Sequence, residues 1–128
     1  FLISMAVLVL TLENIGFSKL FGEFISNQHI IVVGIIAFLI GNLINNIPMT
    51  MFFASVLGTF TANYNMVYSV IVASNICAFL TPVGALAGIM FMKILKENNI
   101  NFNFAKFMLY GLIISIPTLI SSLSILLI

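Results

Sequence analysis

The sequence predicts an all-α membrane protein, and two observations support that fold class. Among its 128 residues, 62% are hydrophobic and only 5% are charged, with a mean hydropathy of +1.30. A soluble domain carries about 25% charged residues, so the charges present here are too few to cover a water-facing surface. The hydrophobic residues also form long runs, which are typical of helices that cross or enter a bilayer.

The charged and reactive residues exclude several functional classes. The chain has four Lys, three Glu, no Arg and no Asp, so no basic tract is available for a nucleic acid. The single cysteine, Cys77, cannot form an internal disulfide or a cysteine-based metal cluster, and we expect it to pack as a small apolar residue. An intramembrane enzyme would need paired Asp, a Ser–His pair or a His-Glu-x-x-His set at membrane depth, and the single His29 lies outside the apolar runs. We therefore expect no catalytic residues and no bound metal.

The N-terminal part of the chain predicts two short helices. Residues 1–12, FLISMAVLVLTL, are apolar but shorter than the about 20 residues that a crossing needs, so we expect them to be the end of a membrane helix. Residues 14–28 place apolar and polar side chains at helical period, which predicts an arm helix lying in the membrane interface. Glu13 and His29 flank this arm and are expected at the interface too. Since the chain opens without Met, we expect it to be a piece of a longer polypeptide.

Residues 30–60 predict a re-entrant helical hairpin. Two apolar arms meet at a corner that contains Asn45, Asn46 and Pro48. Each arm reaches only about 20–23 Å, which is less than the about 30 Å of a bilayer core. A single helix over the whole stretch would carry a proline and a polar cluster at its centre. Two half-crossings that meet inside the membrane are therefore the better interpretation.

Residues 66–92 predict an unwound transmembrane helix. The stretch is long enough to span a bilayer, but Asn75, Thr81, Pro82 and Gly84 interrupt it. Proline removes a backbone donor and frees the carbonyl one turn earlier, and glycine weakens the helix further. We expect the helix to open at Thr81–Gly84.

The C-terminal part predicts a polar loop followed by a plain crossing. Residues 93–106 hold three of the four lysines, and the positive-inside rule then places this loop in the cytoplasm. Residues 107–128 predict the final transmembrane helix, in which Pro117 is tolerated as a kink. The expected topology is that of a multi-pass protein of the cell membrane.

Two interruptions at one membrane depth indicate a binding site. Broken helices inside a bilayer are tolerated only where protein or a water-filled cavity surrounds the freed backbone groups. Asn45 and Asn46 can serve such groups or a bound solute, because an amide both donates and accepts. Discontinuous helices of this kind mark midplane substrate sites in secondary transporters. The alternative is that Asn and Pro here only kink and join packed helices.

The sequence also resembles a known group of carriers at three places. These are LENIGFSKLF at 12–21, NNIPMT at 45–50 and SNICAFLTPVGALAGIM at 74–90, which is followed by a basic loop. Together they resemble the ion transporter superfamily. The pattern is most similar to the arsenite/antimonite permeases, which are related to citrate and sodium/proton carriers.

The resemblance implies a fold of two inverted repeats, of which this chain would supply the second. The missing N-terminal repeat and a homodimer partner are expected on the same ground, as are the lipid bilayer and a small inorganic ion as partners. No cofactor is expected, and coupling to H⁺ or Na⁺ or to a separate ATPase subunit stays open. The residues implied in substrate or ion binding are Asn45, Asn46 and Thr50 at the hairpin tip and Asn75, Thr81 and Gly84 in the unwound segment, with Pro48 and Pro82 as helix breakers.

The implied function is that of a secondary transporter, a permease that exports arsenite or antimonite by alternating access. Arsenite is a neutral trihydroxide near neutral pH, and residues 30–92 contain no charged residue. The first alternative is a sodium/proton antiporter or a citrate/dicarboxylate-type anion carrier. The hairpin tip lacks the Ser-Asn-Thr of the dicarboxylate symporters, which weakens that alternative. The second alternative is a membrane scaffold that transports nothing.

Overall fold

A computed structural model describes residues 2–127, with the side chains of Leu2 and Met5 left aside, and over this part the chain is all-helical, as predicted. Phe1 and Ile128, the outer ends of the predicted segments 1–12 and 107–128, lie outside the described residues. The helices are α1 (Leu2–Asn14), α2 (Phe17–Ser26), α3 (Ile30–Ile44), α4 (Asn46–Leu57), α5 (Tyr64–Ile76), the 3₁₀ turn η1 (Cys77–Phe79), α6 (Leu86–Glu97) and α7 (Phe104–Ile125).

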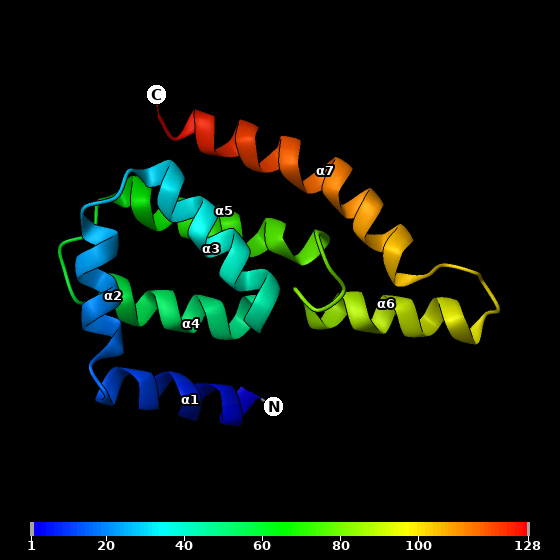
Figure 1. Ribbon diagram of the computed structural model, residues 1–128, viewed down its shortest axis with the longest axis horizontal. Coiled ribbons are helices and arrows are strands. Elements are labelled where there is room, and N and C mark those ends of the chain that lie inside the picture. Colours follow the sequence, from blue (N-terminus) through cyan, green and yellow to red (C-terminus); the bar gives the residue numbers. More distant parts are fainter. Residues whose placement is uncertain (1, 128) are drawn as a thin grey trace.

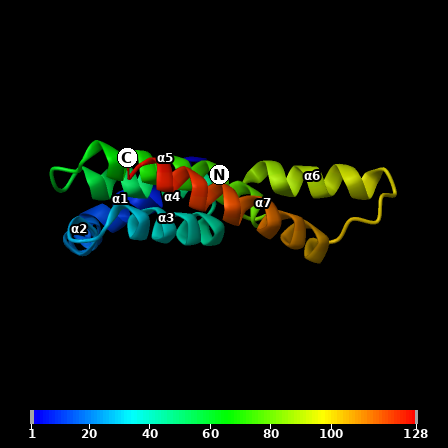
Figure 2. The ribbon, with the colours of Figure 1, turned by 90° about the horizontal axis from the view of Figure 1, so that it is seen from above.

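The helices form an elongated layer (Figures 1 and 2). α3 and α4 make a hairpin, and α3 packs most extensively on α5. α5 and α6 run in the same direction along the long axis, separated by an irregular turn, and α2 runs across the ends of α1 and α4 (Figure 1). Beyond that turn, α6 and the start of α7 project from the rest of the molecule (Figure 2).

Small residues allow α3 and α5 to approach closely. Ala37 and Gly41 on α3 and Ala73 on α5 are buried at this contact. A Cβ on Gly41 would lie 2.6 Å from the Sγ of Cys77, which is itself fully buried. In a bilayer, helix association depends on such close packing, because lipid tails are as apolar as the helix surface. The expected packing role of Cys77 fits its place here.

α7 packs on α5, η1 and α3 with one face. That face holds the buried residues Gly111, Ser115, Leu119 and Leu123, which recur every fourth position. α7 is also the one helix among residues 2–127 that is long and apolar enough to cross a membrane, with a mean hydropathy of 1.8. Pro117 lies on its exposed side inside a continuous helix.

The helix boundaries near the lysines differ from the sequence expectation. α6 continues through Lys93 and Lys96 to Glu97, so the connection to α7 covers only residues 98–103. Lysine and glutamate are good helix formers, which explains the longer helix. α7 begins at Phe104 because the Oδ1 of Asn103 accepts a hydrogen bond from the backbone N–H of Lys106 at 2.9 Å. The expected loop of 93–106 is therefore half helical.

Candidate functional site

The corner between α3 and α4 consists of a single residue. Asn45 has φ 78° and ψ 150°, a conformation that is otherwise almost restricted to glycine. Its Oδ1 accepts a hydrogen bond from the N–H of Ile47 at 3.4 Å and so caps α4. Pro48 is the third residue of α4, where a helix needs no N–H donor. The break therefore falls at Asn45, and Pro48 lies within the first turn of α4.

The second interruption lies between η1 and α6. The N–H of Leu80 donates to the carbonyl of Cys77 at 3.2 Å, and the N–H of Gly84 donates to both the carbonyl and the hydroxyl of Thr81, each at 3.1 Å. Pro82 is buried between them and supplies no donor. Residues 80–85 thus form a tight turn instead of continuing the helix.

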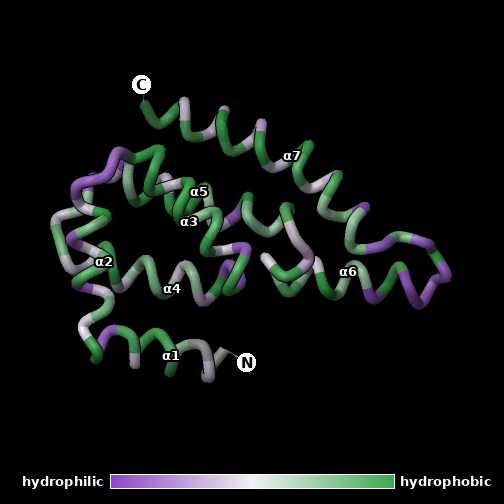
Figure 3. Tube along the Cα trace, in the orientation of Figure 1, coloured by the Kyte–Doolittle hydropathy of each residue, from purple (hydrophilic) through white to green (hydrophobic). Residues whose placement is uncertain are grey.

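Three hydrogen bonds join the two interruptions into one junction. The Nδ2 of Asn45 donates to the carbonyl of Val83 at 3.2 Å, and the backbone N–H of Asn46 donates to the carbonyl of Gly84 at 3.0 Å. The hydroxyl of Thr81 donates to the Oδ1 of Asn42 at 3.3 Å. Each such bond contributes about 0.5–1.5 kcal/mol, and an unmade one would cost more in hydrocarbon. The junction is the uncharged polar centre of an apolar region (Figure 3).

The junction keeps several backbone groups open. Among residues 2–127, the carbonyls of residues 42–44 at the end of α3 accept no hydrogen bond. At the start of α6, the backbone N–H groups of Leu86 and Ala87 donate none within the same part of the chain. The side-chain amide of Asn46 also makes no hydrogen bond within this part of the chain. Acceptors and donors are therefore both available within a few residues of the contact between the tip and the turn.

The structure brings some of the sequence-predicted residues together and leaves others apart. Asn45, Asn46, Thr81 and Gly84 meet at the junction. Thr50 lies one turn along α4, and its hydroxyl donates to the carbonyl of Asn46 at 2.7 Å.

Asn75 is exposed on α5, and its amide donates only to the carbonyl of Ile71 within the same helix, at 2.8 Å. Asn42, in contrast, is part of the junction, although it is not among the site residues predicted from the sequence. It lies one turn before Asn45 and Asn46, and that spacing on an apolar helix could have identified it.

An apolar cavity of about 580 Å³ lies beside the tip, between α1 and the hairpin. Leu12 lines it from α1, Ile44 and Pro48 line it from the hairpin, and Val83 and Leu86 line it from the turn. Asn45 and Thr11 are the polar residues of its wall. The junction thus borders a space large enough for a small solute.

Substitution of Asn45 should separate backbone strain from hydrogen bonding. We expect Asn45→Ala to be less stable than Asn45→Gly by about 1–2 kcal/mol, because both lose the side-chain bonds but only Ala is strained at φ 78°. The measurement is denaturant unfolding of the full-length protein in micelles. At Asn98, where φ is −90°, the order of the two variants should be the reverse. Equal stability of the two Asn45 variants would contradict the conformation of the corner.

An apolar, all-helical chain whose polar groups converge on two facing helix interruptions belongs to the class of integral membrane transport proteins. The comparison with protein families identifies the particular group. The model of the arsenical pump membrane protein (ArsB) family matches residues 1–128, and the chain belongs to that family. The resemblance seen in the sequence is thereby confirmed, and the protein is a membrane transport protein. No solved structure matches the chain.

Proposed function

We propose that the protein exports arsenite or antimonite as a secondary transporter and that the junction between the α3–α4 tip and the 80–85 turn forms half of its substrate site. The observation that carries the proposal is a polar junction without any charged residue: residues 30–92 contain no Lys, Arg, Asp or Glu. A neutral trihydroxide needs hydrogen-bond donors and acceptors but no counter-charge.

The open groups of the junction match such a solute. The carbonyls of residues 42–44 and the amide of Asn46 would accept from its hydroxyls, and the first N–H groups of α6 would donate to its oxygens. The thiol of Cys77 is fully buried and donates to the carbonyl of Ser74 at 3.1 Å. A site built from amides and backbone groups would release arsenite more readily than a thiol would.

Of the two helix starts at the junction, only that of α6 leaves N–H groups free for an anion, and that of α4 does not. A helix N-terminus attracts anions through its unpaired N–H groups. Here the N–H of Asn46 is bound to Gly84 and that of Ile47 to the Asn45 side chain, while Pro48 has none. The citrate/dicarboxylate alternative therefore finds no free donors at this helix start. The carbonyls of residues 42–44 would also suit a coupling Na⁺, whereas H⁺ coupling needs an acidic residue outside 30–92.

The arrangement of the helices supports a re-entrant hairpin and alternating access. At about 1.5 Å per residue, α3 is about 22 Å long and α4 about 18 Å, so neither would cross a core of about 30 Å. If the long axis of the molecule is the membrane normal, the hairpin enters and leaves on one side and α2 lies in that interface (Figure 1). α5, η1 and α6 would together form one unwound crossing. The lysine-bearing turn would then face the cytoplasm, and a second, inverted repeat and a dimer partner would complete the transporter.

The test is arsenite retention in cells that lack other arsenic exporters and express the full-length protein. We expect Asn46→Ala to lower efflux about tenfold, because it removes an amide that supports no part of the fold. Its backbone bonds to Gly84 and Thr50 remain. Asn98→Ala removes an exposed amide at the distal end of α6 and should export normally. If the well-expressed native protein leaves arsenite retention unchanged, the assignment of arsenite as substrate is wrong. If Asn46→Ala exports arsenite normally, the assignment of the junction as the substrate site is wrong.

A further inference from the structure

The turn between α6 and α7 borders an open, cationic pocket of about 560 Å³ that the transport site does not use. Lys93, Lys96 and Lys106 line it, together with Asn101 and Asn103. Three of the four lysines of the chain thus surround one space at the end of the molecule that lies farthest from α2 (Figure 1). A concentration of positive charge in a protein this poor in charge indicates an anionic partner.

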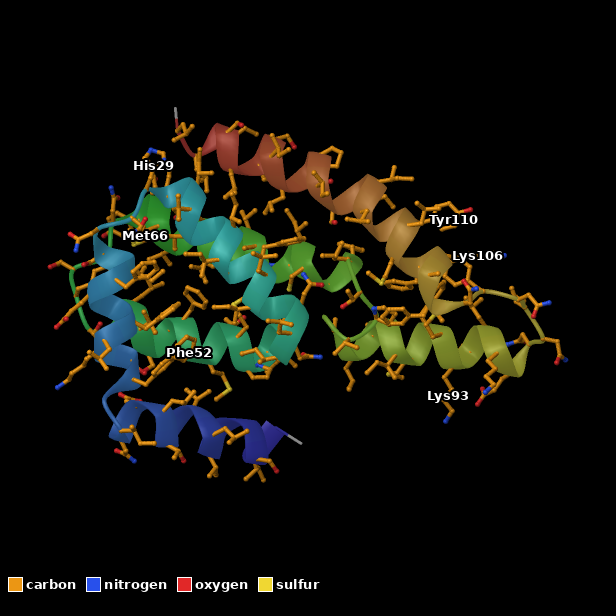
Figure 4. All side chains as sticks on the ribbon, viewed as in Figure 1. His29, Phe52, Met66, Lys93, Lys106 and Tyr110 are labelled. Atoms are coloured by element: carbon orange, nitrogen blue, oxygen red, sulfur yellow. The ribbon has the colours of Figure 1, made fainter. Side chains whose placement is uncertain are left out.

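Two of these lysines are without a carboxylate partner within residues 2–127. The one ion pair in this part of the chain joins Lys93 to Glu97 at 3.8 Å, and the side chain of Lys93 points away from α7 (Figure 4). Lys96 and Lys106 are therefore the free cations. The Nζ of Lys106 donates to the carbonyl of Asn101 at 3.2 Å, which holds the ammonium over the turn. The start of α7 adds the positive end of a helix dipole there.

An apolar cavity adjoins the cationic pocket. It has a volume of about 500 Å³, lies between α6 and α7, and is lined by Phe91, Phe102, Phe107 and Tyr110. The ring centroids of Phe91 and Phe102 are 6.0 Å apart, and Phe102 stacks on Tyr110 at 6.1 Å. Phe102 lines both cavities, so a cationic pocket and an apolar slot meet at its ring.

We propose that this hairpin holds one anionic phospholipid, with the phosphate between Lys96 and Lys106 and an acyl chain in the apolar cavity. A free phosphate would use only the first half of this arrangement, and a neutral lipid only the second. Tyr110 lines the apolar cavity, and tyrosine is typical of the membrane interface, where phosphate and hydrocarbon meet. The proposal is independent of the transported substrate, because none of its residues lies at the junction.

The test is native mass spectrometry of the purified full-length protein with short-chain phosphatidylglycerol. We expect Lys96→Gln and Lys106→Gln each to weaken its binding about fivefold and the double variant about 25-fold. Ile114→Trp, which places a ring in the apolar cavity, should also weaken it while leaving both lysines in place. Lys19→Gln removes the same charge from α2, at the other end of the molecule, and should bind like the native protein.

Binding measurements with phosphatidylcholine and with inorganic phosphate distinguish an anionic phospholipid from a neutral lipid and from free phosphate. Phosphatidylcholine should bind more weakly than phosphatidylglycerol in the native protein and equally in the double variant, and millimolar inorganic phosphate should not displace the lipid. Equal binding of phosphatidylglycerol to the double variant and to Lys19→Gln would overturn the proposal. Displacement by inorganic phosphate, with no effect of Ile114→Trp, would assign the pocket to free phosphate instead. If the double variant does not fold, the two single variants decide the same question.

Discussion

Replacing Gly111 with Ala is expected to detach α7 from the rest of the molecule. An added Cβ would overlap the carbonyl oxygen of Phe79 and lie 2.9 Å from that of Leu80. Both atoms belong to the backbone, so no side-chain rotation relieves the overlap and either η1 or α7 must move. Forcing a methyl group into a packed contact costs about 1–3 kcal/mol, and a backbone contact places this site at the upper end. Since η1 leads directly into the 80–85 turn, efflux should fall together with stability.

The expected loss is measured as the thermal midpoint and folded yield of the full-length Gly111→Ala protein in micelles. Gly58→Ala is the matched control, because a Cβ there would lie no closer than 3.4 Å to the carbonyls of Ala54 and Ser55. A Gly111→Ala protein as stable as the control would contradict the packing of α7 on η1.

The corner of the hairpin could be predicted from the sequence because its signal is local. Asn45 and Asn46 interrupt apolar runs, and a polar pair in such a setting needs a buried partner or a ligand. The sequence predicts Pro48 in the corner itself, whereas the structure places it in the first turn of α4. Proline breaks a helix interior but is accepted in a first turn, and only the structure shows that α4 already includes it.

The partners across the junction could not be predicted, because they are far apart in the chain. The hydrogen bond between Asn42 and Thr81 spans 39 residues, and that between Asn45 and Val83 spans 38. Composition and period identify which residues are polar, not which of them face each other. Asn75 shows the reverse error: it is polar within an apolar run, yet its amide is satisfied within its own helix.

The hydrogen bonds between the hairpin tip and the 80–85 turn couple the movements of these two elements. The tip of the hairpin is bonded to the 80–85 turn through Asn45, Asn46 and Thr81, so a displacement of either interruption carries the other with it. Moving them separately would leave several polar groups unpaired in an apolar region, at about 1–3 kcal/mol each. Any opening of the site therefore has to occur elsewhere than between these two elements.

Gly84→Ala should disrupt the junction between the hairpin tip and the turn and strongly lower efflux. A Cβ at Gly84 would lie 2.6 Å from the carbonyl oxygen of Cys77 and 3.1 Å from the Oδ1 of Asn42. The turn must then withdraw from the tip, and withdrawal breaks the bond from the Asn46 N–H to the Gly84 carbonyl and the bond from Thr81 to Asn42. Losing two bonds of about 1 kcal/mol each, and the geometry of the open groups with them, should lower arsenite efflux by more than about tenfold.

Hydrogen exchange at Asn46 distinguishes this effect from general unfolding. In the native protein the Asn46 N–H is bound to the turn and should exchange slowly, whereas in Gly84→Ala it should exchange rapidly. The amides of α7 between Leu119 and Leu123 should stay protected in both proteins, since Leu123 packs on Gly34 of α3 and not on the turn. Fast exchange throughout α7 would mean that Gly84→Ala unfolds the chain. Slow exchange at Asn46 with normal efflux would mean that the tip and the turn do not depend on each other, and the site would have to be sought elsewhere.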